Sequence, residues 1–249
     1  MPHHILIAAA IELELEYISK SMKQVRSLCI GNRKIIEGIL GNHNIRLIET
    51  GPGMVNTIQA LTASIENLKP SLIIQTGCAG AFPESGLRLG DIGIAGEEVD
   101  IHLGIEPASP YDAVVELPFS VAVQNGIAFK NRYNCNPSLT DYAFQCLVRR
   151  FHDQGIRVKK GPFVTVSTIT STNQKAASLF HHYSAIMEAM EGSGAAHLSI
   201  HYDIPFLEIR AASNMVGERD RSNWDLPLAC RRSNEAVIAF LVSWDSRVI

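Results

Sequence analysis

Three mostly apolar runs constrain the fold of this chain more than any other feature of its sequence. Residues 5–10, 72–76 and 204–210 are rich in Ile and Leu and lack the regular polar alternation of a half-exposed strand. Continuous apolar runs of this length are typical of strands that are buried on both faces of a parallel sheet. A sheet of that kind needs helices on both sides, so the runs predict an α/β protein.

The remaining pattern places helices and hairpin strands between these runs. Residues 104–141 are richer in Pro, Asn and aromatic residues and predict a loop-rich insertion. We therefore expect one domain over residues 1–249, built as a three-layer α/β/α sandwich with a central mixed β-sheet. The predicted helices span residues 12–18, 56–68, 142–151, 173–183, 192–201 and 234–244, and the other predicted strands span 35–40, 44–49, 90–95, 162–169 and 185–188.

Composition excludes several classes of function. The net charge of -3 gives no electrostatic footprint for nucleic acid or for an anionic membrane surface, and no apolar run approaches a membrane span. The five cysteines are odd in number and form no CxxC pattern, which favours reduced thiols. The start of the chain has no basic region typical of a secretory signal, so we expect a cytoplasmic protein. We expect neither a metal nor another cofactor.

Polar residues follow two of the apolar runs, where open α/β sheets place their chemistry. Ser213 and Asn214 come after residues 204–210, and Asn offers a donor beside an acceptor, as a ring with N–H next to C=O requires. Glu14 follows residues 5–10 and has two interpretations. It is either a general base for water or an acidic residue in the first turn of a helix.

Two small-residue segments and one acidic pair complete the candidate site. Gly51-Pro52-Gly53 favours a structural turn over an anion-binding site. Residues 76–81 predict a second turn, which either lines a cleft with backbone or allows a helix to pack closely on the sheet. Glu191 precedes a helix of small residues. It either stabilises the helix N-terminus or holds a vicinal diol, with Met190 as an apolar face beside it.

In this order the motifs resemble the purine nucleoside phosphorylase/nucleosidase superfamily over essentially the whole chain. Within it the chain looks most like the futalosine hydrolases, in residues 51–57, 97–104 and 212–220 together with Trp224. The resemblance implies hydrolysis of the N-glycosidic bond of futalosine, which releases hypoxanthine and dehypoxanthine futalosine in menaquinone biosynthesis. It also implies a homodimer or larger homo-oligomer that binds a small purine nucleoside.

The resemblance implies roles for matching positions. Glu14 would activate water, and Asn214 replaces the Asp with which methylthioadenosine/S-adenosylhomocysteine nucleosidases protonate a departing adenine. Asn therefore favours a 6-oxopurine, and Cys78 stands where related enzymes often carry Ser, which puts a hydroxyl contact there in question. The implied substrate-binding residues are Gly53, Cys78, Ala79, Gly80, Ile169, Thr170, Met190, Glu191, Ser213 and Arg219.

Other functions stay open at this point. A phosphorylase would need arginines for phosphate, for which Arg33 and Arg88 are candidates, whereas Glu14 near the reacting carbon suits water. Adenine-specific cleavage of methylthioadenosine or aminodeoxyfutalosine is a second alternative. A non-catalytic nucleoside sensor would need no water-activating carboxylate.

Two arginines near the end of the candidate site also have two interpretations. Arg219 or Arg221 could pair with the benzoate tail of futalosine. An ion pair with a neighbouring carboxylate, Glu218, Asp220 or Asp225, is the favoured alternative.

Overall fold

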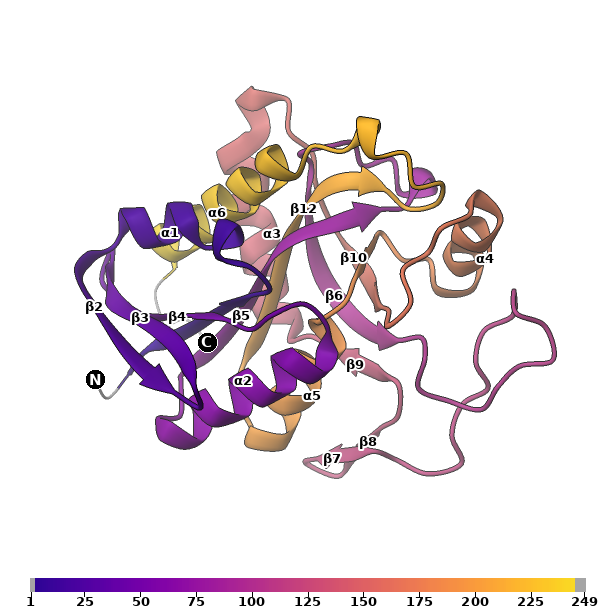
Figure 1. Ribbon diagram of the computed structural model, residues 1–249, viewed down its shortest axis with the longest axis horizontal. Coiled ribbons are helices and arrows are strands. Elements are labelled where there is room, and N and C mark those ends of the chain that lie inside the picture. Colours follow the sequence, from indigo (N-terminus) through magenta and orange to yellow (C-terminus); the bar gives the residue numbers. More distant parts are fainter. Residues whose placement is uncertain (1–2, 245–249) are drawn as a thin grey trace.

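The computed structural model describes residues 3–244 and confirms the expected mixed α/β fold, with a central sheet flanked by helices (Figure 1). The strands are β1 (Ile5–Ala9), β2 (Lys23–Ile30), β3 (Arg33–Leu40), β4 (His43–Glu49), β5 (Leu72–Ala81), β6 (Ile92–Asp100), β7 (Ala122–Gln124), β8 (Ile127–Phe129), β9 (Arg132–Asn134), β10 (Val158–Thr165), β11 (Met187–Ala189) and β12 (Phe206–Met215). The helices are α1 (Glu16–Ser21), α2 (Met54–Asn67), α3 (Pro137–Phe151), α4 (Asn173–Tyr183), α5 (Gly192–Tyr202) and α6 (Leu226–Ser243), with 3-10 turns that include η1 (Glu12–Glu14) and η4 (Arg221–Asn223).

The sheet is mixed because it contains both parallel and antiparallel strand pairs. β1 runs parallel to β4 and β5, β12 runs parallel to β5, and β6 is antiparallel to β12. The short strand β11 pairs with β10 on one side and with β5 on the other. One half of the sheet therefore closes on itself, with β11 as the strand that completes the ring.

Helices cover the two faces of the sheet unequally. α2 and α5 pack on one face through small and aliphatic side chains, among them Ala60, Leu61 and Ala196. α1, α3 and α6 pack on the other face, where Ile18 and Phe240 lie in the core. Figure 1 shows α4 standing apart from both groups. Burial of these apolar faces is the main favourable term in folding.

Several elements differ from their predicted bounds. Residues 77–80 are part of β5 and do not form the predicted turn, because cross-strand pairing with β12 extends the strand through its glycines. β2 was not predicted. α6 begins at Leu226, eight residues before the predicted start, where the Asp225 side chain caps the helix and Pro227 occupies its first turn. The bounds of β10, β11 and α1 also differ from the predicted ones.

The predicted insertion contains more regular structure than its composition indicates. β7 and β8 form a separate hairpin, and β9 joins the main sheet at β6. α3 begins at Pro137, inside the predicted loop, because Asn136 accepts a capping hydrogen bond from Leu139 N at 3.1 Å. The loop before β7 extends away from the body of the molecule (Figure 1).

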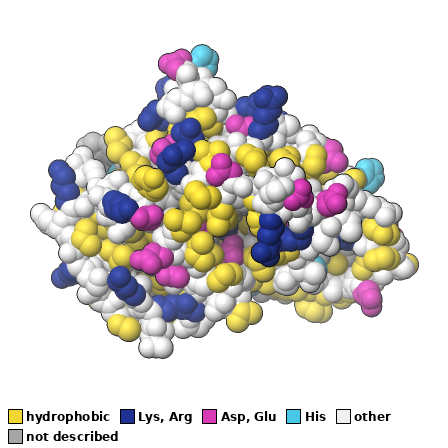
Figure 2. All heavy atoms as spheres, turned by 45° about the horizontal axis from the view of Figure 1, so that its top comes forward, with side chains coloured by type: hydrophobic (Ala, Val, Ile, Leu, Met, Phe, Trp, Pro, Cys, Tyr) yellow, Lys and Arg dark blue, Asp and Glu magenta, His cyan; other side chains and the backbone are white. Residues whose placement is uncertain are grey.

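Figure 2 shows that basic, acidic and hydrophobic side chains are interspersed on one face of the molecule, with no broad field of a single charge. Within residues 3–244, no helix has both the length and the apolar character that crossing a membrane requires.

The side chain of Asn234 ties α6 to the segment that carries Glu14. It accepts from Ile18 N at 3.1 Å and donates to the Glu14 carbonyl at 2.7 Å. Asn234→Ala leaves both buried backbone groups unsatisfied, so we expect the free energy of unfolding to fall by about 2–3 kcal/mol. Urea unfolding measures this loss. The exposed Arg231→Ala on the same helix should change it by less than about 0.5 kcal/mol, and equal effects of the two changes would contradict the prediction.

Candidate active site

A cleft of about 240 Å³ opens where β1, β5 and β12 end. Larger hollows lie elsewhere on the surface, but this one brings buried carboxylates, an arginine and an amide together, as ligand sites do. The residues that line it are Ala10, Ile11, Glu14, Pro52, Cys78, Ala79, Gly80, Val166, Ile169, Glu188, Ala189, Met190, Glu191, Arg210, Ser213, Asn214, Arg219, Trp224 and Leu226.

Most of the predicted site residues are in this lining. The two that are not, Gly53 and Thr170, lie one contact behind it. Gly53 N donates to Glu191 Oε1 at 2.9 Å, and Thr170 N donates to Glu188 Oε1 at 3.2 Å. The cleft thus collects residues from six separate parts of the sequence. Arg210 and Glu188 are lining residues that the sequence did not indicate.

Glu14 is buried at the end of β1 and is held by backbone amides. Its Oε2 accepts from Ala10 N at 3.0 Å and Ile11 N at 3.1 Å, and its Oε1 accepts from Cys78 N at 2.8 Å. The carboxylate therefore turns back over β5. A Cβ on Gly77, where φ is +137°, would lie 2.4 Å from Glu14 Oε1, so only glycine fits beneath it.

Glu191 immediately precedes α5, but its side chain makes no capping bond to that helix. Its Oε1 accepts a hydrogen bond from Gly53 N, and its Oε2 accepts one from Arg210 Nη2 at 3.0 Å. The turn at Gly51 and Gly53, with φ of +83° and +91°, thus directs a backbone donor at a carboxylate of the protein itself. Met190 N also donates to Glu191 Oε2 at 3.3 Å, so the carboxylate is fixed at the side of the cleft.

Arg210 is the buried cation that holds this side of the site together. It is 1% exposed, and it donates through Nε to Glu208 Oε1 at 2.6 Å and through Nη1 to the Cys78 carbonyl at 3.0 Å. A guanidinium in this position stays charged. The sequence signal was present in Glu208-x-Arg210, two charges on one face of an otherwise apolar strand.

Behind Arg210 two buried carboxyl groups face each other. The Glu98 and Glu208 oxygens lie within 2.5 Å of the point where a Cβ on Gly192 would stand. Burial and the neighbouring Glu208 charge raise the pKa of Glu98 well above its usual range. Glu98 therefore keeps its proton and shares it with Glu208, while Thr165 Oγ1 donates to Glu98 Oε2 at 2.8 Å. The charged groups nearest to this pair are Arg210 and Glu191.

Asn214 lies at the opposite end of the cleft from Glu14. Ser213 Oγ donates to Asn214 Oδ1 at 2.8 Å, and Asn214 Nδ2 donates to the Met215 carbonyl at 3.0 Å. This orientation leaves the second hydrogen of Nδ2 and a second lone pair of Oδ1 for a ligand. Glu14 reaches β5 at Gly77, and Asn214 pairs with Gly80 of the same strand. Gly77 and Gly80 are three residues apart on that strand, a separation of about 10 Å.

Arg219 makes none of the ion pairs found within residues 3–244, so the favoured pairing with Glu218, Asp220 or Asp225 is wrong. Two of the expected partners are engaged elsewhere. Asp225 caps α6 and Asp220 bonds Ser222. The guanidinium of Arg219 lies over the Trp224 ring instead, 4.6 Å from its centroid. This stacking keeps a positive charge at the lining of the cleft.

The thiol of Cys78 contributes no charge to the site. A hydrogen bond with the Cys230 thiol, burial and the Glu14 carboxylate raise the pKa of Cys78 well above its usual range. The thiol therefore stays protonated, and the nucleophile at this end of the cleft must come from elsewhere.

The shared proton of Glu98 gives a pH dependence of stability. Above about pH 4.5 the unfolded chain loses this proton and the folded chain keeps it, so the free energy of unfolding falls as pH rises toward the raised pKa. Glu98→Gln still donates to Glu208 and removes the titration. We expect its unfolding free energy to fall less than that of the wild type between pH 5 and pH 8, by about 1 kcal/mol or more.

Denaturant unfolding across that pH range tests this expectation. The exposed Glu84→Gln serves as the matched control, because it removes a carboxyl group that lies in solvent. Parallel pH profiles for the wild type and Glu98→Gln would show that Glu98 does not carry the proton.

Comparison with known proteins gives the same fold and places the chain in a family. The model of the phosphorylase superfamily matches residues 4–243. A 5'-methylthioadenosine/S-adenosylhomocysteine nucleosidase of Haemophilus ducreyi is 26% identical over 238 residues, which cover 94% of this chain and 96% of that one. One of Bacillus cereus is 25% identical and covers 89% of this chain and 90% of its own.

Solved structures agree in fold at lower identity. The nucleosidase of Neisseria meningitidis in complex with methylthio-immucillin-A has a TM-score of 0.81 at 22% identity and covers 97% of this chain and 99% of that one. The futalosine hydrolase of Helicobacter pylori has a TM-score of 0.82 at 18% identity and covers 98% and 99%. The expected class, an N-glycosyl hydrolase, is confirmed at the level of the family. With a family match over nearly its whole length, this chain belongs to the phosphorylase superfamily.

Proposed function

We propose that this protein hydrolyses the N-glycosidic bond of a 6-oxopurine nucleoside and that its substrate is futalosine, with hypoxanthine as the leaving base. The observation that carries the choice of base is Asn214. Its amide can donate to O6 and accept from N7–H of the departing base. A carboxylic acid at this position would instead suit protonation of N7 in adenine.

The contacts of the buried charges favour water over phosphate as the nucleophile. The Glu14 carboxylate would repel a phosphate dianion at this end of the cleft and suits a water molecule. Arg210 is fully engaged with two glutamates and a carbonyl, so it is not free for phosphate. Arg33 bonds Gln59 on the surface, and neither Arg33 nor Arg88 lines the cleft.

The mechanism follows from where charge develops. When the glycosidic bond breaks, the ribose becomes positive and the purine gains electron density. The Glu191 carboxylate, beside the apolar side chain of Met190, holds the ribose hydroxyls on the positive side. Glu14 removes a proton from the attacking water, and Asn214 stabilises the leaving purine. Such preorganised groups can each contribute a few kcal/mol of transition-state stabilisation.

Cleavage of methylthioadenosine or S-adenosylhomocysteine is the second candidate function. It is supported by the names of the relatives at 25% and 26% identity, and aminodeoxyfutalosine belongs to the same adenine class. Asn214 is the residue that argues against it. A purely sensory role is disfavoured because Glu14 and Glu191 are both buried and oriented in the cleft.

Three substrates are enough to separate these functions. Purified protein is incubated with futalosine, inosine and methylthioadenosine, each with and without phosphate, and the released base is quantified. We expect hypoxanthine release from futalosine without phosphate. A strict requirement for phosphate would establish a phosphorylase, and turnover of methylthioadenosine alone would establish the adenine function.

Asn214 should control both rate and preference. Asn214→Ala removes both hydrogen bonds to the leaving base, so we expect kcat for futalosine to fall by about 100-fold or more while the melting temperature changes little. Asn214→Asp should shift the ratio of kcat/KM toward methylthioadenosine, because an acid can protonate N7. Unchanged futalosine turnover in Asn214→Ala would exclude this role.

Glu14 should control the chemical step. Glu14→Gln keeps the size of the side chain but cannot take a proton from water, so we expect kcat to fall by about 100-fold or more with little change in KM. Steady-state kinetics with futalosine measures both constants. The neighbouring, exposed Glu12→Gln is the matched control, and an equal loss in that variant would contradict the assignment.

A further inference from the structure

A buried carboxyl pair, Glu98 and Glu208, packs against the backbone that carries Glu191. The next residue in the chain is Gly192, where a Cβ would lie 2.4 Å from Glu208 Oε2 and 2.5 Å from Glu98 Oε1. These distances are too short for any real contact, so the two carboxyl groups fit only against a glycine. The pair therefore touches the main chain at the point where Glu191 is attached.

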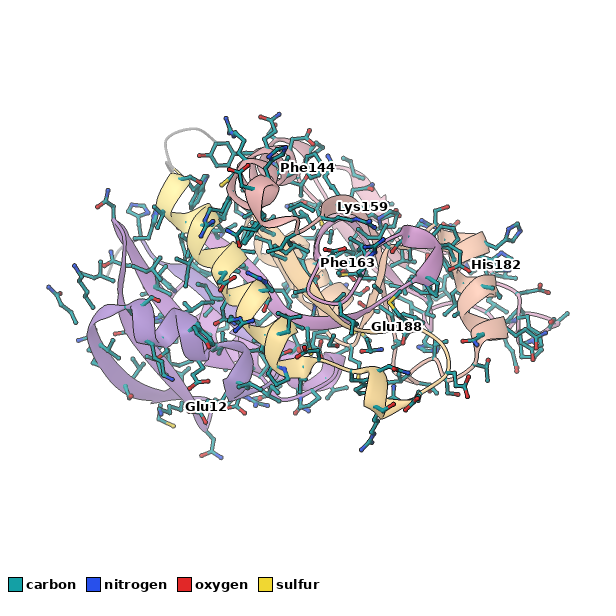
Figure 3. The ribbon with its side chains drawn as sticks, turned by 90° about the horizontal axis from the view of Figure 1, so that it is seen from above. Glu12, Phe144, Lys159, Phe163, His182 and Glu188 are labelled. Atoms are coloured by element: carbon teal, nitrogen blue, oxygen red, sulfur yellow. The ribbon has the colours of Figure 1, made fainter. Side chains whose placement is uncertain are left out.

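A second contact joins the pair to the first turn of α5. Ser193 N donates to Thr165 Oγ1 at 2.8 Å, and Thr165 Oγ1 donates in turn to Glu98 Oε2 at 2.8 Å. Thr165 is the last residue of β10, and Figure 3 shows Phe163 of the same strand in the interior of the molecule. The backbone after Glu191 is thus bound to Glu98 through Thr165.

The side chain of Glu191 is bound to the same pair through Arg210. Glu208 and Arg210 are two residues apart on β12 and therefore lie on one face of the strand. Arg210 Nε donates to Glu208 Oε1 at 2.6 Å, and Arg210 Nη2 donates to Glu191 Oε2 at 3.0 Å. Because the guanidinium is a rigid planar fork, the bond at Nε sets the direction of the bond to Glu191.

Both oxygens of Glu208 are engaged, so its carboxyl plane is fixed. Oε1 accepts from Arg210. Glu208 Oε2 and Glu98 Oε1 have no donor among residues 3–244 apart from the proton that the two groups share. Glu208 is 0% exposed and Glu98 is 1% exposed, so solvent does not compete for that proton. Neither residue lines the cleft, and both act on a ligand only through Glu191.

We propose that Glu208 and Glu98 are positioning residues that hold Glu191 for the ribose hydroxyls. They hold it twice, through the Arg210 guanidinium and through the backbone of α5. This inference rests on the proposed function in one respect, the contact between Glu191 and the ribose, and it is independent of which purine is the leaving base. Loss of the pair therefore weakens recognition of the sugar and spares recognition of the base.

Three competitors separate recognition of the sugar from recognition of the base. Inhibition constants are measured against futalosine cleavage for inosine, for 2′,3′-dideoxyinosine, which lacks both ribose hydroxyls, and for hypoxanthine. We expect the wild type to bind inosine at least about tenfold more tightly than dideoxyinosine, because the missing hydroxyls leave a buried carboxylate unpaired. The ratio of these two inhibition constants is the hydroxyl preference.

The variant Glu208→Gln removes the charge that holds Arg210 Nε and keeps the size of the side chain. A hydrogen bond to a neutral acceptor is weaker than one to a carboxylate, so we expect the hydroxyl preference to fall by about fivefold or more. The inhibition constant of hypoxanthine should change by less than about twofold, because the base does not contact this pair. Equal weakening of all three competitors, or an unchanged hydroxyl preference, would overturn the proposal.

The matched control is Glu37→Gln. Glu37 is also 1% exposed and also accepts from an arginine, Arg46 Nε at 2.7 Å, but it lies on β3 and does not line the cleft. We expect this variant to lower the melting temperature and to leave the hydroxyl preference at the wild-type value. An equal loss of preference in Glu37→Gln would show that destabilisation alone produces the effect.

A conservative variant tests the part of Glu98. The amide of Glu98→Gln still donates to Glu208, so we expect it to keep most of the hydroxyl preference, whereas Glu98→Leu, which cannot donate, should lose it as Glu208→Gln does. A loss in Glu98→Gln as large as that in Glu98→Leu would contradict the role of the shared proton.

The outcomes keep this inference apart from the proposed function. If futalosine is not cleaved, the proposed substrate is wrong, and adenosine, 2′,3′-dideoxyadenosine and adenine are compared in the same way against cleavage of methylthioadenosine. If the wild type has no hydroxyl preference, the proposed role of Glu191 fails together with this inference. If the wild type has the preference and Glu208→Gln retains it, the proposed function stands and the positioning role fails.

Discussion

The buried charge of Arg210 is the interaction on which the cleft depends. Glu191, Glu208 and Glu98 lie in one interior region, where unpaired carboxylates would be very costly. The guanidinium pairs with Glu191 and Glu208 directly, and the proton on Glu98 removes one of the two negative charges that a single guanidinium leaves uncompensated among the three glutamates. Arg210 also bonds the Cys78 carbonyl, so the strand beneath Glu14 and the carboxylate of Glu191 are positioned by the same side chain.

Local signals were sufficient for much of the fold and for part of the site. The hairpin of β3 and β4 and the helices α4 and α5 follow from turn residues and helical periodicity close in sequence. Asn214 and Glu14 were found because each follows an apolar run that forms a buried strand. Residues 77–80 were predicted as a turn because glycines usually end strands, and pairing with the distant strand β12, together with β11 at Gly80, keeps them extended.

The residues that sequence reasoning missed depend on contacts between distant segments. In the sequence, Glu188 is one of two acidic residues near the start of a predicted helix. It lies beside Gly80 only because β11 pairs with β5. In the sequence, Arg210 is only a polar residue at the end of an apolar run. The fold brings Glu191 and Cys78 to it from distant segments. Charges inside an otherwise apolar strand are the one sequence signal that could have identified Arg210, since burying them requires partners.

The pairing of β11 on both of its edges has a consequence for how a ligand enters. A strand of three residues bonded only on one side would open readily, but β11 is fixed between β10 and β5. Glu188 and Ala189 are therefore part of a rigid frame, whereas Arg219 and Trp224, which stack on each other, lie in the segment after β12 that no strand pairing holds. A ligand in the cleft therefore meets paired strands on one side and, on the other, two side chains that can shift without breaking a strand pairing.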